Sequence, residues 1–435
     1  MPKKPSDFRY ESGPAQVPWA AVGENYNAED VIELIKFLFQ KNGDGYDEAL
    51  KQVEASVRSL SEVGKSPGKL SLGAKVSELE EIMKEYLGVE YCSFLTNATA
   101  GFEFGYKYAN LGPGDEVIAP AITFIATISY PLSVGAKVVF ADVDPKSINM
   151  DPADVERKIT EKTKVIIPVH IGGWPVDMDP IMRLAEKYDL VVIEDAAHAF
   201  GAEYKGKKAG TIGHFGSFSF HEVKNVTSFG EGGIVCTNLP FGGHFGKCRF
   251  LGVDMSRKIK NWLYDVVPLD GKYGPFAAGN SSSTEIQAIG LIQQMKRMDS
   301  IIKERRKNAE YLVERLKEND AIIVPPMDTS QIQSTHHLFL LQIDPEKAGG
   351  DIQILKQKLQ EKGITNIPHF APLYKFDVVK RMGYPVEDIE ASCPQTEEVF
   401  NRRFTHLPLY GLTTEQLQYM ADGVLEAVSE MQSGK

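Results

Sequence analysis

One lysine lies between an aromatic, strand-like segment and a glycine-rich turn. The segment SFSFHEVKNVTSFGEGG places Lys224 after the aromatic run and ahead of Glu231. A lysine amine can form a Schiff base with a carbonyl compound when its surroundings lower its pKa. A single lysine is more often an ordinary solvated side chain. Other residues of matching chemistry must therefore decide between these interpretations.

Pyridoxal phosphate is the common cofactor that exploits such a lysine, and the sequence offers candidates for the other parts of its site. The cofactor needs a carboxylate for its ring nitrogen, a flat group against its ring and a cradle for its phosphate. Asp195 follows the apolar run LVVIE and could supply the carboxylate. In TNATAG, Thr99 lies at a predicted strand-to-helix turn, where backbone N–H groups and the helix dipole favour an anion. Ser219 could add a hydroxyl to this cradle, and Phe124 could cover the ring.

Each candidate also has a structural explanation when it is taken alone. Asp195 could be a helix cap. Thr99 and Phe124 would more often be structural or core residues, and His170 and His198 would more often be hydrogen-bonded core histidines than catalysts. The joint order of these residues along the chain, rather than any one of them, favours a cofactor site.

The elements around these residues predict an α/β fold. Short apolar runs, such as DEVIAP, KVVFADVD, KVIIPVH and LVVIEDAAH, alternate with helical segments such as DPIMRLAEKYD. This pattern predicts a mainly parallel central sheet sandwiched by helices. Ligands of such sheets bind beyond the carboxyl ends of the strands. The residues that directly follow the apolar runs are Asn97, Ala98, Thr99, Thr123, Phe124, His170, Asp195 and His198.

The pattern changes after about residue 290. The segment EIQAIGLIQQMKRMDSIIKERRKNAEYLVERLKEN has apolar positions at helical spacing and predicts one long helix. The strand-like HHLFLLQID and the helical DIQILKQKLQEKG and TTEQLQYMADGVLEAVSEM follow it. These segments predict a smaller α+β domain at the carboxyl end.

Three domains are expected. They are an N-terminal arm with a helical insertion (1–67), a large cofactor-binding α/β domain (68–295) and a small α+β domain (296–435). A charged helical segment near 45–68 and the segment VDMSRKIKNWLYDVVPLDGKYGPFAAGNSSS, which is rich in Gly, Ser and aromatic residues and contains a loop at 253–279, look like additions to this plan. Long loops of this kind are often functional.

Composition narrows the class of protein. The 435 residues carry a net charge of −11 without a basic segment, so we expect no nucleic acid and no membrane surface as a partner. The four cysteines have no metal spacing and are too few for a disulfide framework, so we expect no metal. No signal peptide is recognisable, and no apolar run approaches the ~20 residues of a membrane span. We therefore expect a cytoplasmic protein with a small-molecule site.

Several longer segments resemble the DegT and DnrJ sugar aminotransferase family of fold-type I pyridoxal-phosphate enzymes. They include TNATAGFEFG, GPGDEVIAPAITFIATISYPLSVGAKVVFADVDP, VVIEDAAHAFGAEYKGKKAGTIGHFGSFSFHEVKN, GEGGIVCTN and HLPLYGLTTEQ. Together with the other matching segments, they cover most of residues 68–430. The resemblance implies the aminotransferase-like fold of that family and pyridoxal 5'-phosphate as the cofactor.

The resemblance also implies roles for individual residues. Lys224 would form the Schiff base with the cofactor and then carry the proton between substrate and cofactor. Asp195 would pair with the ring nitrogen, and His198 would lie near the 3-hydroxyl. Phe124 would stack on the ring, while Ala98, Thr99 and Ser219 would hold the phosphate. Asn280 would reach the phosphate of the neighbouring subunit, so a homodimer with shared active sites is expected.

The chain departs from the family pattern at several positions. Ser282 stands where an arginine is usual, Ala98 replaces a glycine, and Glu222 stands where proline or alanine is commoner. The loop before Asn280 is also unusually long. These departures leave the predicted cofactor residues in place and concern the usual contacts to a sugar nucleotide.

Three functions fit these patterns. The first is an aminotransferase that passes nitrogen from glutamate or glutamine to a keto sugar, nucleotide-linked, or to a related cyclic ketone by ping-pong kinetics. The second is a sugar dehydratase on the same scaffold, against which Lys224 argues because that subgroup carries histidine at this position. The third is a cofactor-binding regulator without turnover, which would need a DNA-binding segment or a basic face. A fold alone does not decide among them.

Overall fold

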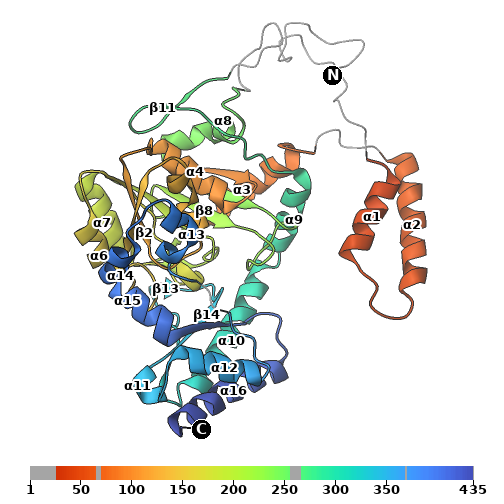
Figure 1. Ribbon diagram of the computed structural model, residues 1–435. Helices are drawn as coiled ribbons and strands as arrows, with labels where there is room; N and C mark the ends of the chain where they lie inside the picture. Colours follow the sequence, from red (N-terminus) through yellow and green to blue (C-terminus); the bar gives the residue numbers. More distant parts are fainter. Residues whose placement is uncertain (1–25, 65–69, 255–265, 368–369, 435) are drawn as a thin grey trace. The chain divides into compact units, whose positions relative to one another are not determined.

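The computed structural model of the protein (Figure 1) describes residues 26–64, 70–254, 266–367 and 370–434. The chain divides into two compact units, one of Met1–Gly73 with Ser256–Tyr264 and one of Ala74–Met255 with Asp265–Lys435. The domain boundary predicted at residue 67 lies outside the described residues, and so does much of the predicted loop at 253–279. Within the described ranges, none of the helices is both long enough and apolar enough for a membrane span.

The first unit contains two amphipathic helices, α1 (Ala28–Leu38) and α2 (Tyr46–Val63), which are joined by residues 39–45. Asn27 caps α1, since its side chain accepts from the amides of Glu29 and Asp30. Arg58 of α2 donates to Glu29 of α1 at 2.7 Å, which ties the two helices together. The charged helix predicted near 45–68 is thus confirmed for the residues of α2.

A seven-stranded sheet forms the centre of the second unit. The spatial order of its strands is β1 (Tyr91–Leu95), β9 (Gly233–Thr237), β8 (Phe215–Ser219), β5 (Val191–Asp195), β4 (Thr163–Ile166), β2 (Glu116–Pro120) and β3 (Lys137–Ala141). All neighbouring pairs from β8 to β3 are parallel, and the one antiparallel strand, β9, separates β8 from β1. The predicted mainly parallel sheet is confirmed.

Helices cover both faces of this sheet (Figure 1). Side chains alternate along a strand, so Val191 and Ile193 of β5 pack into one apolar cluster and Val192 packs into another. The first cluster contains residues of α4 (Ala98–Tyr108) and α5 (Ala126–Ser133). The opposite face is covered by α3 (Ala74–Leu87), α6 (Pro152–Lys158), α7 (Met178–Tyr188) and α9 (Glu285–Met295).

The carboxyl-terminal part has a smaller antiparallel sheet backed by helices, as predicted for an α+β domain. Its strands follow in the order β12 (Ile322–Ile323), β14 (Phe339–Ile343) and β15 (Phe404–Leu407). Its apolar core is shared with the helices α10 (Met298–Leu316), α11 (Pro345–Ala348), α12 (Ile352–Glu361) and α16 (Thr414–Gln432). The predicted domain division between residues 295 and 296 stays a prediction.

The single long helix predicted from residue 285 onward is wrong, because the chain breaks between α9 and α10. The amide of Arg297 donates to the carbonyl of Gln294 at 2.9 Å, which is the tighter i to i−3 bond of a 3₁₀ turn. Arg297 also has φ −113° and ψ 0°, outside regular helical geometry. The apolar spacing continues through this break, and neither proline nor glycine marks it in the sequence. The sequence therefore carries no signal of the break.

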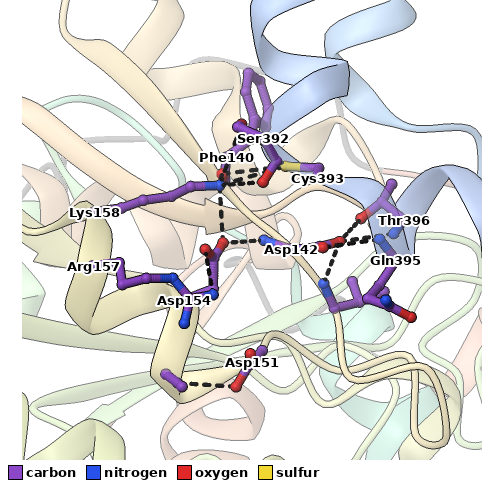
Figure 2. Close-up of polar contacts among 12 residues, drawn as sticks. Phe140, Asp142, Asp151, Asp154, Arg157, Lys158, Ser392, Cys393, Gln395 and Thr396 are labelled. Atoms are coloured by element: carbon purple, nitrogen blue, oxygen red, sulfur yellow. Dashed lines mark hydrogen bonds and ion pairs between the residues drawn. The ribbon is translucent and has the colours of Figure 1, made fainter.

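The edge strand β3 is tied to a carboxyl-terminal helical segment (Figure 2). Asp142, which follows β3, accepts hydrogen bonds from the amides of Gln395 and Thr396 and from the Thr396 hydroxyl at 2.7 to 2.9 Å. Lys158 donates to the carbonyl of Phe140 at 2.7 Å and to that of Ser392 at 3.2 Å. The segment contains α13 (Asp377–Arg381), α14 (Val386–Ser392), α15 (Pro394–Glu398) and a π-helical turn (Val399–Arg403).

The remaining elements are short. They are β6 (Glu203–Tyr204), β7 (Lys207–Lys208), β10 (Leu269–Asp270), β11 (Pro275–Phe276), β13 (Ile332–Gln333) and α8 (Phe245–Arg249).

Candidate active site

Asp195 is the last residue of β5 and lies at the carboxyl edge of the sheet. Its side chain is buried and accepts a hydrogen bond from the Thr127 hydroxyl at 2.8 Å and another from the amide of Ala197 at 3.1 Å. Burial raises the pKa of Asp195, whereas the two hydrogen bonds and the charge of Lys224 oppose that rise. The carboxylate is therefore fixed in place and desolvated, as required of a partner for a buried cation.

Lys224 lies in the connection between β8 and β9, which folds back on itself. Backbone hydrogen bonds from Phe220 to Gly232 (2.8 Å) and from Glu222 to Gly230 (3.0 Å) close this connection. Desolvation lowers the pKa of Lys224 to about 8, and the charge of Asp195 opposes the shift. Neutral amine is thus accessible near neutral pH, which is the property that a Schiff-base lysine needs.

The first turn of α4 lies directly against β8 and β9. The Ser217 hydroxyl donates to the carbonyl of Ala98 at 2.9 Å. A Cβ atom on Gly101 would come 2.1 Å from the Ser217 Oγ, and one on Gly233 would come 2.2 Å from the carbonyl carbon of Asn97. The two glycines are therefore required for this close approach.

The amino end of α4 provides N–H groups at the carboxyl edge of the sheet. Asn97 caps the helix by accepting from the amide of Ala100 at 3.0 Å, and the amides of Ala98 and Thr99 precede that bonded group. The first N–H groups of a helix lack intrahelical acceptors and lie at the positive end of its dipole. Ser219 ends β8, directly opposite Gly233 of β9, and so lies beside this helix end. The arrangement can hold a phosphate group.

His198 is buried against residues of the carboxyl-terminal part. The amide of Gly172 donates to its Nδ1 at 3.3 Å. Its ring centroid lies 4.6 Å from that of His337 and 5.7 Å from that of Phe370, with the latter ring stacked. His198 therefore links the end of β5 to the segment before β14.

His337 connects this cluster to the lysine turn. His337 Nδ1 and the side-chain oxygen of Asn225, the residue after Lys224, are 2.7 Å apart. The side-chain amide of Asn225 donates to the carbonyl of Thr335 at 3.3 Å, and the Thr335 hydroxyl donates to the carbonyl of His198 at 2.7 Å. These contacts fix the turn that carries Lys224 against His198.

His170 is a buried, hydrogen-bonded core histidine, which is the structural explanation considered for it from the sequence. Its Nε2 lies 2.9 Å from a carboxylate oxygen of Glu194, and its Nδ1 accepts from the amide of Val176 at 3.0 Å. Glu194 in turn accepts from the amides of Gly210, Ile212 and Gly213. This buried pair holds the chain on either side of β5 in place.

Phe124 and Asn280 are more exposed to solvent than the other predicted site residues. The side chain of Phe124 is 59% exposed, so the alternative that it is an ordinary core residue is wrong. Asn280 is exposed and accepts from the amide of Ser282 at 3.1 Å. It borders a small cavity with Lys107 of α4. The structure thus brings Asp195, Lys224, His198, Ser219, Ala98 and Thr99 to one edge of the sheet, whereas Asn280 lies beside the body of α4.

Three residues of this site escaped the sequence analysis. Thr127 is spaced four residues after Thr123, and that repeat of threonines was the available signal for it. Asn225 and His337 contact each other across 112 positions of the chain, and neither carries a local signal.

Comparison with known proteins places this geometry in a family. Residues 51–425 match the family model of the DegT/DnrJ/EryC1/StrS aminotransferase family. The chain belongs to this family. It is an aminotransferase, as the sequence resemblance implied, and its fold is that of the fold-type I enzymes.

Individual relatives agree with this membership. A protein of Methanocaldococcus jannaschii whose function is uncharacterized is 34% identical over 369 residues, which cover 83% of this chain and 92% of that protein. The UDP-4-amino-4-deoxy-L-arabinose–oxoglutarate aminotransferase of Shewanella sediminis is 34% identical over 321 residues, with coverage of 73% and 80%. The protein Spr1654 of Streptococcus pneumoniae, named as a sugar aminotransferase, has been solved in its PLP form. That structure has a TM-score of 0.71 and 29% identity, and covers 87% of this chain and 97% of its own.

Proposed function

We propose that this aminotransferase moves an amino group from glutamate or glutamine to a keto sugar, nucleotide-linked, or to a related cyclic ketone. The observation that carries the chemistry is the placement of buried Asp195 and of Lys224, whose pKa is lowered to about 8, at one edge of the sheet, where the charge of each acts on the pKa of the other. Membership of this family, together with relatives named UDP-4-amino-4-deoxy-L-arabinose–oxoglutarate aminotransferase and GDP-perosamine synthase, supports the class of acceptor.

Pyridoxal 5'-phosphate is the cofactor of this reaction, and the residues present fit it. Bound there, it supplies an aldehyde and a pyridine ring that withdraws electrons from the reacting carbon. Lys224 would hold the aldehyde carbon and Asp195 the ring nitrogen, with His198 near the 3-hydroxyl and Phe124 against the ring. The phosphate would be held by Ala98, Thr99 and Ser219. The close approach of α4 permitted by Gly101 and Gly233 supports this cradle.

The chain's own residues then divide the work. Asp195, whose charged form the Thr127 and Ala197 hydrogen bonds favour, would hold a positive charge on the ring nitrogen. Lys224 would take the proton from the substrate carbon and return it at the cofactor side, because its amine is close to half-neutral near pH 8. Lys224 serves both half-reactions, so ping-pong kinetics are expected.

A homodimer with shared active sites belongs to the same proposal. Asn280 is exposed and lies beside the body of α4 rather than at the Lys224 turn of its own chain. We propose that it reaches the phosphate held by a second copy.

The test is the visible absorption spectrum of the purified protein loaded with pyridoxal phosphate, recorded before and after addition of glutamate or glutamine. The proposal predicts a visible band that either amino acid bleaches, and restoration of the band by a nucleotide-linked keto sugar. Lys224→Ala should fold but show neither the band nor the response. A protein that takes up no pyridoxal phosphate, or whose band no amino acid changes, would contradict the proposal.

A further inference from the structure

Tyr106 of α4 places a hydroxyl group in the apolar core beside the candidate active site. Its side chain is fully buried, and its ring stacks on that of Tyr130 in α5, with centroids 5.6 Å apart and planes 8° apart. The hydroxyl donates to the backbone carbonyl of Thr127 at 2.6 Å. A phenylalanine would fill the same space and keep the stacked rings, so packing alone does not explain the hydroxyl.

The carbonyl that Tyr106 reaches is one that α5 cannot satisfy in the regular way. The sequence of α5 is ATISYPLS, and it contains a buried proline, Pro131, four residues after Thr127. In a regular α-helix the amide of residue i+4 donates to the carbonyl of residue i, but proline has no N–H and its ring crowds that carbonyl. Thr127 therefore lacks its regular helical donor, and the Tyr106 hydroxyl supplies one from a neighbouring helix.

The surroundings of Tyr106 make its hydroxyl a permanent donor. Burial raises the pKa of Tyr106 well above its usual value, and the charge of Asp195 adds to the rise. The side chain therefore keeps its proton at neutral pH. A buried backbone carbonyl that loses a donor is costly, so the bond from Tyr106 stabilises the first turn of α5.

Thr127 connects this bond with the candidate site. Its side-chain hydroxyl donates to the Asp195 carboxylate at 2.8 Å, and its amide donates to the carbonyl of Phe124 at 3.2 Å. Asp195 and Phe124 are the residues proposed to hold the ring nitrogen and to lie against the ring of the cofactor. The orientation of one residue, Thr127, therefore affects two proposed contacts to the cofactor.

We propose that Tyr106 is a positioning residue for Asp195. Its hydroxyl replaces the helical donor that Pro131 removes, and so keeps the Thr127 hydroxyl on the carboxylate. This inference rests on the proposed function, in which Asp195 serves the cofactor. It makes the residues at positions 106 and 131 interdependent, because an N–H group at position 131 would make the Tyr106 hydroxyl dispensable.

The first test is a double-mutant cycle on the cofactor-free protein, followed by its thermal unfolding midpoint. Tyr106→Phe should lower the midpoint by about 2 to 4 °C, because the buried Thr127 carbonyl loses its donor. In the Pro131→Ala background, where residue 131 regains an N–H, the same change should lower the midpoint by less than about 1 °C. Tyr130→Phe removes a hydroxyl from the stacked ring, and this matched control should unfold like wild type.

The second test is the pH dependence of the rate at which glutamate bleaches the visible band of the loaded enzyme. Tyr106→Phe should move the acidic limb to higher pH, because a displaced Thr127 hydroxyl no longer favours the charged form of Asp195. At neutral pH the rate should fall about tenfold, as expected for a small misplacement of a group that holds the cofactor. The double variant Tyr106→Phe/Pro131→Ala should recover both the limb and the rate.

The outcomes separate this inference from the proposed function. If Tyr106→Phe has the same effects with proline and with alanine at position 131, the hydroxyl does not replace the missing amide and the inference is overturned. It is also overturned if Tyr106→Phe behaves like wild type. If wild type responds to no amino acid, the proposed function fails, while the unfolding cycle still decides whether Tyr106 replaces the helical donor. Should Pro131→Ala not fold, equal midpoints and limbs in Tyr106→Phe and Tyr130→Phe would overturn the inference.

Discussion

Thr127 donates its hydroxyl to the Asp195 carboxylate at 2.8 Å, across 68 positions of the chain. The same hydroxyl lies 3.2 Å from that of Thr123, so a short buried relay of hydroxyl groups ends on the carboxylate. Because this bond favours the charged form of Asp195, it offsets part of the rise in pKa that burial causes. The ionisation of Asp195 therefore depends on a residue of another element, the amino end of α5.

Thr127→Val should move the acidic limb of the glutamate half-reaction to higher pH. Loss of a hydrogen bond that favours the charged form raises the pKa of Asp195 further. The pH dependence of the bleaching rate measures this shift. Thr123→Val removes a hydroxyl that contacts Thr127 rather than Asp195, so its shift should be smaller. If the acidic limb of the bleaching rate lies at the same pH in Thr127→Val and wild type, Thr127 does not control the ionisation of Asp195.

Uptake of pyridoxal phosphate by the cofactor-free protein should speed up with rising pH and level off above about pH 8. The neutral amine is the reacting form, and burial lowers the pKa of Lys224 to about 8. The growth of the visible band after mixing, recorded between pH 6 and 10, gives the midpoint. A midpoint near the ordinary lysine value of about 10.4 would show that Lys224 is solvated.

His337→Phe should flatten the loss of stability of the cofactor-free protein at acidic pH. Burial, together with the charges of His198 and Lys224, holds the pKa of His337 well below its usual value. The unfolded chain therefore binds a proton below about pH 6.5 that the folded chain does not, and stability falls as the pH drops through that value. Urea unfolding of both proteins between pH 5 and 7.5 checks the difference in slope.

The same variant should also be less stable at pH 7.5, by about 1 to 3 kcal/mol. Phenylalanine keeps a ring against His198 but leaves the buried Asn225 oxygen without its 2.7 Å partner. Identical slopes and identical midpoints for variant and wild type would rule out this role of His337.

Asp142→Ala should destabilise the second unit by about 2 to 4 kcal/mol, because three donors of Gln395 and Thr396 lose their acceptor. Asp151→Ala is the control. Asp151, also labelled in Figure 2, caps α6 by accepting a hydrogen bond from the amide of Ala153 at 2.9 Å. Loss of that cap should cost about 1 kcal/mol. Denaturant unfolding ranks the two, and an equal loss would mean that Asp142 does not hold the α15 segment in place.

Hybrids of two inactive variants should recover activity if Asn280 serves a partner's site. Lys224→Ala and Asn280→Ala chains, each nearly inactive alone, would form mixed dimers with one intact site. Equal mixing at random should restore about a quarter of the wild-type rate. Mixed dimers purified by two different affinity tags and still inactive would exclude the shared site.

Local patterns in the sequence were sufficient for much of the fold and for part of the site. The apolar run of β5 ends at Asp195 and the glycine-rich turn follows Lys224, so both residues could be placed at the edge of a parallel sheet from their own neighbours. The amino end of α4 could also be predicted from its own sequence, because TNATAG contains both the capping residue and the small residues of the first turn.

Long-range contacts explain what the sequence did not predict. Thr127, Asn225 and His337 act through hydrogen bonds to residues 68 and 112 positions away, which no local pattern reports. The break between α9 and α10 follows from the turn at Arg297, where the apolar spacing itself is uninterrupted.

Helix α10 also limits how this enzyme can be recombined with its relatives. Met298 and Ile302 complete the apolar cluster on one face of the large sheet, and Leu312 and Leu316 belong to the core of the smaller sheet. A chimaera joined at residue 295 would insert a foreign helix into both cores. A crossover after residue 316 would instead set Leu312 and Leu316 against a foreign smaller core, so neither end of α10 separates two modules that can be exchanged independently.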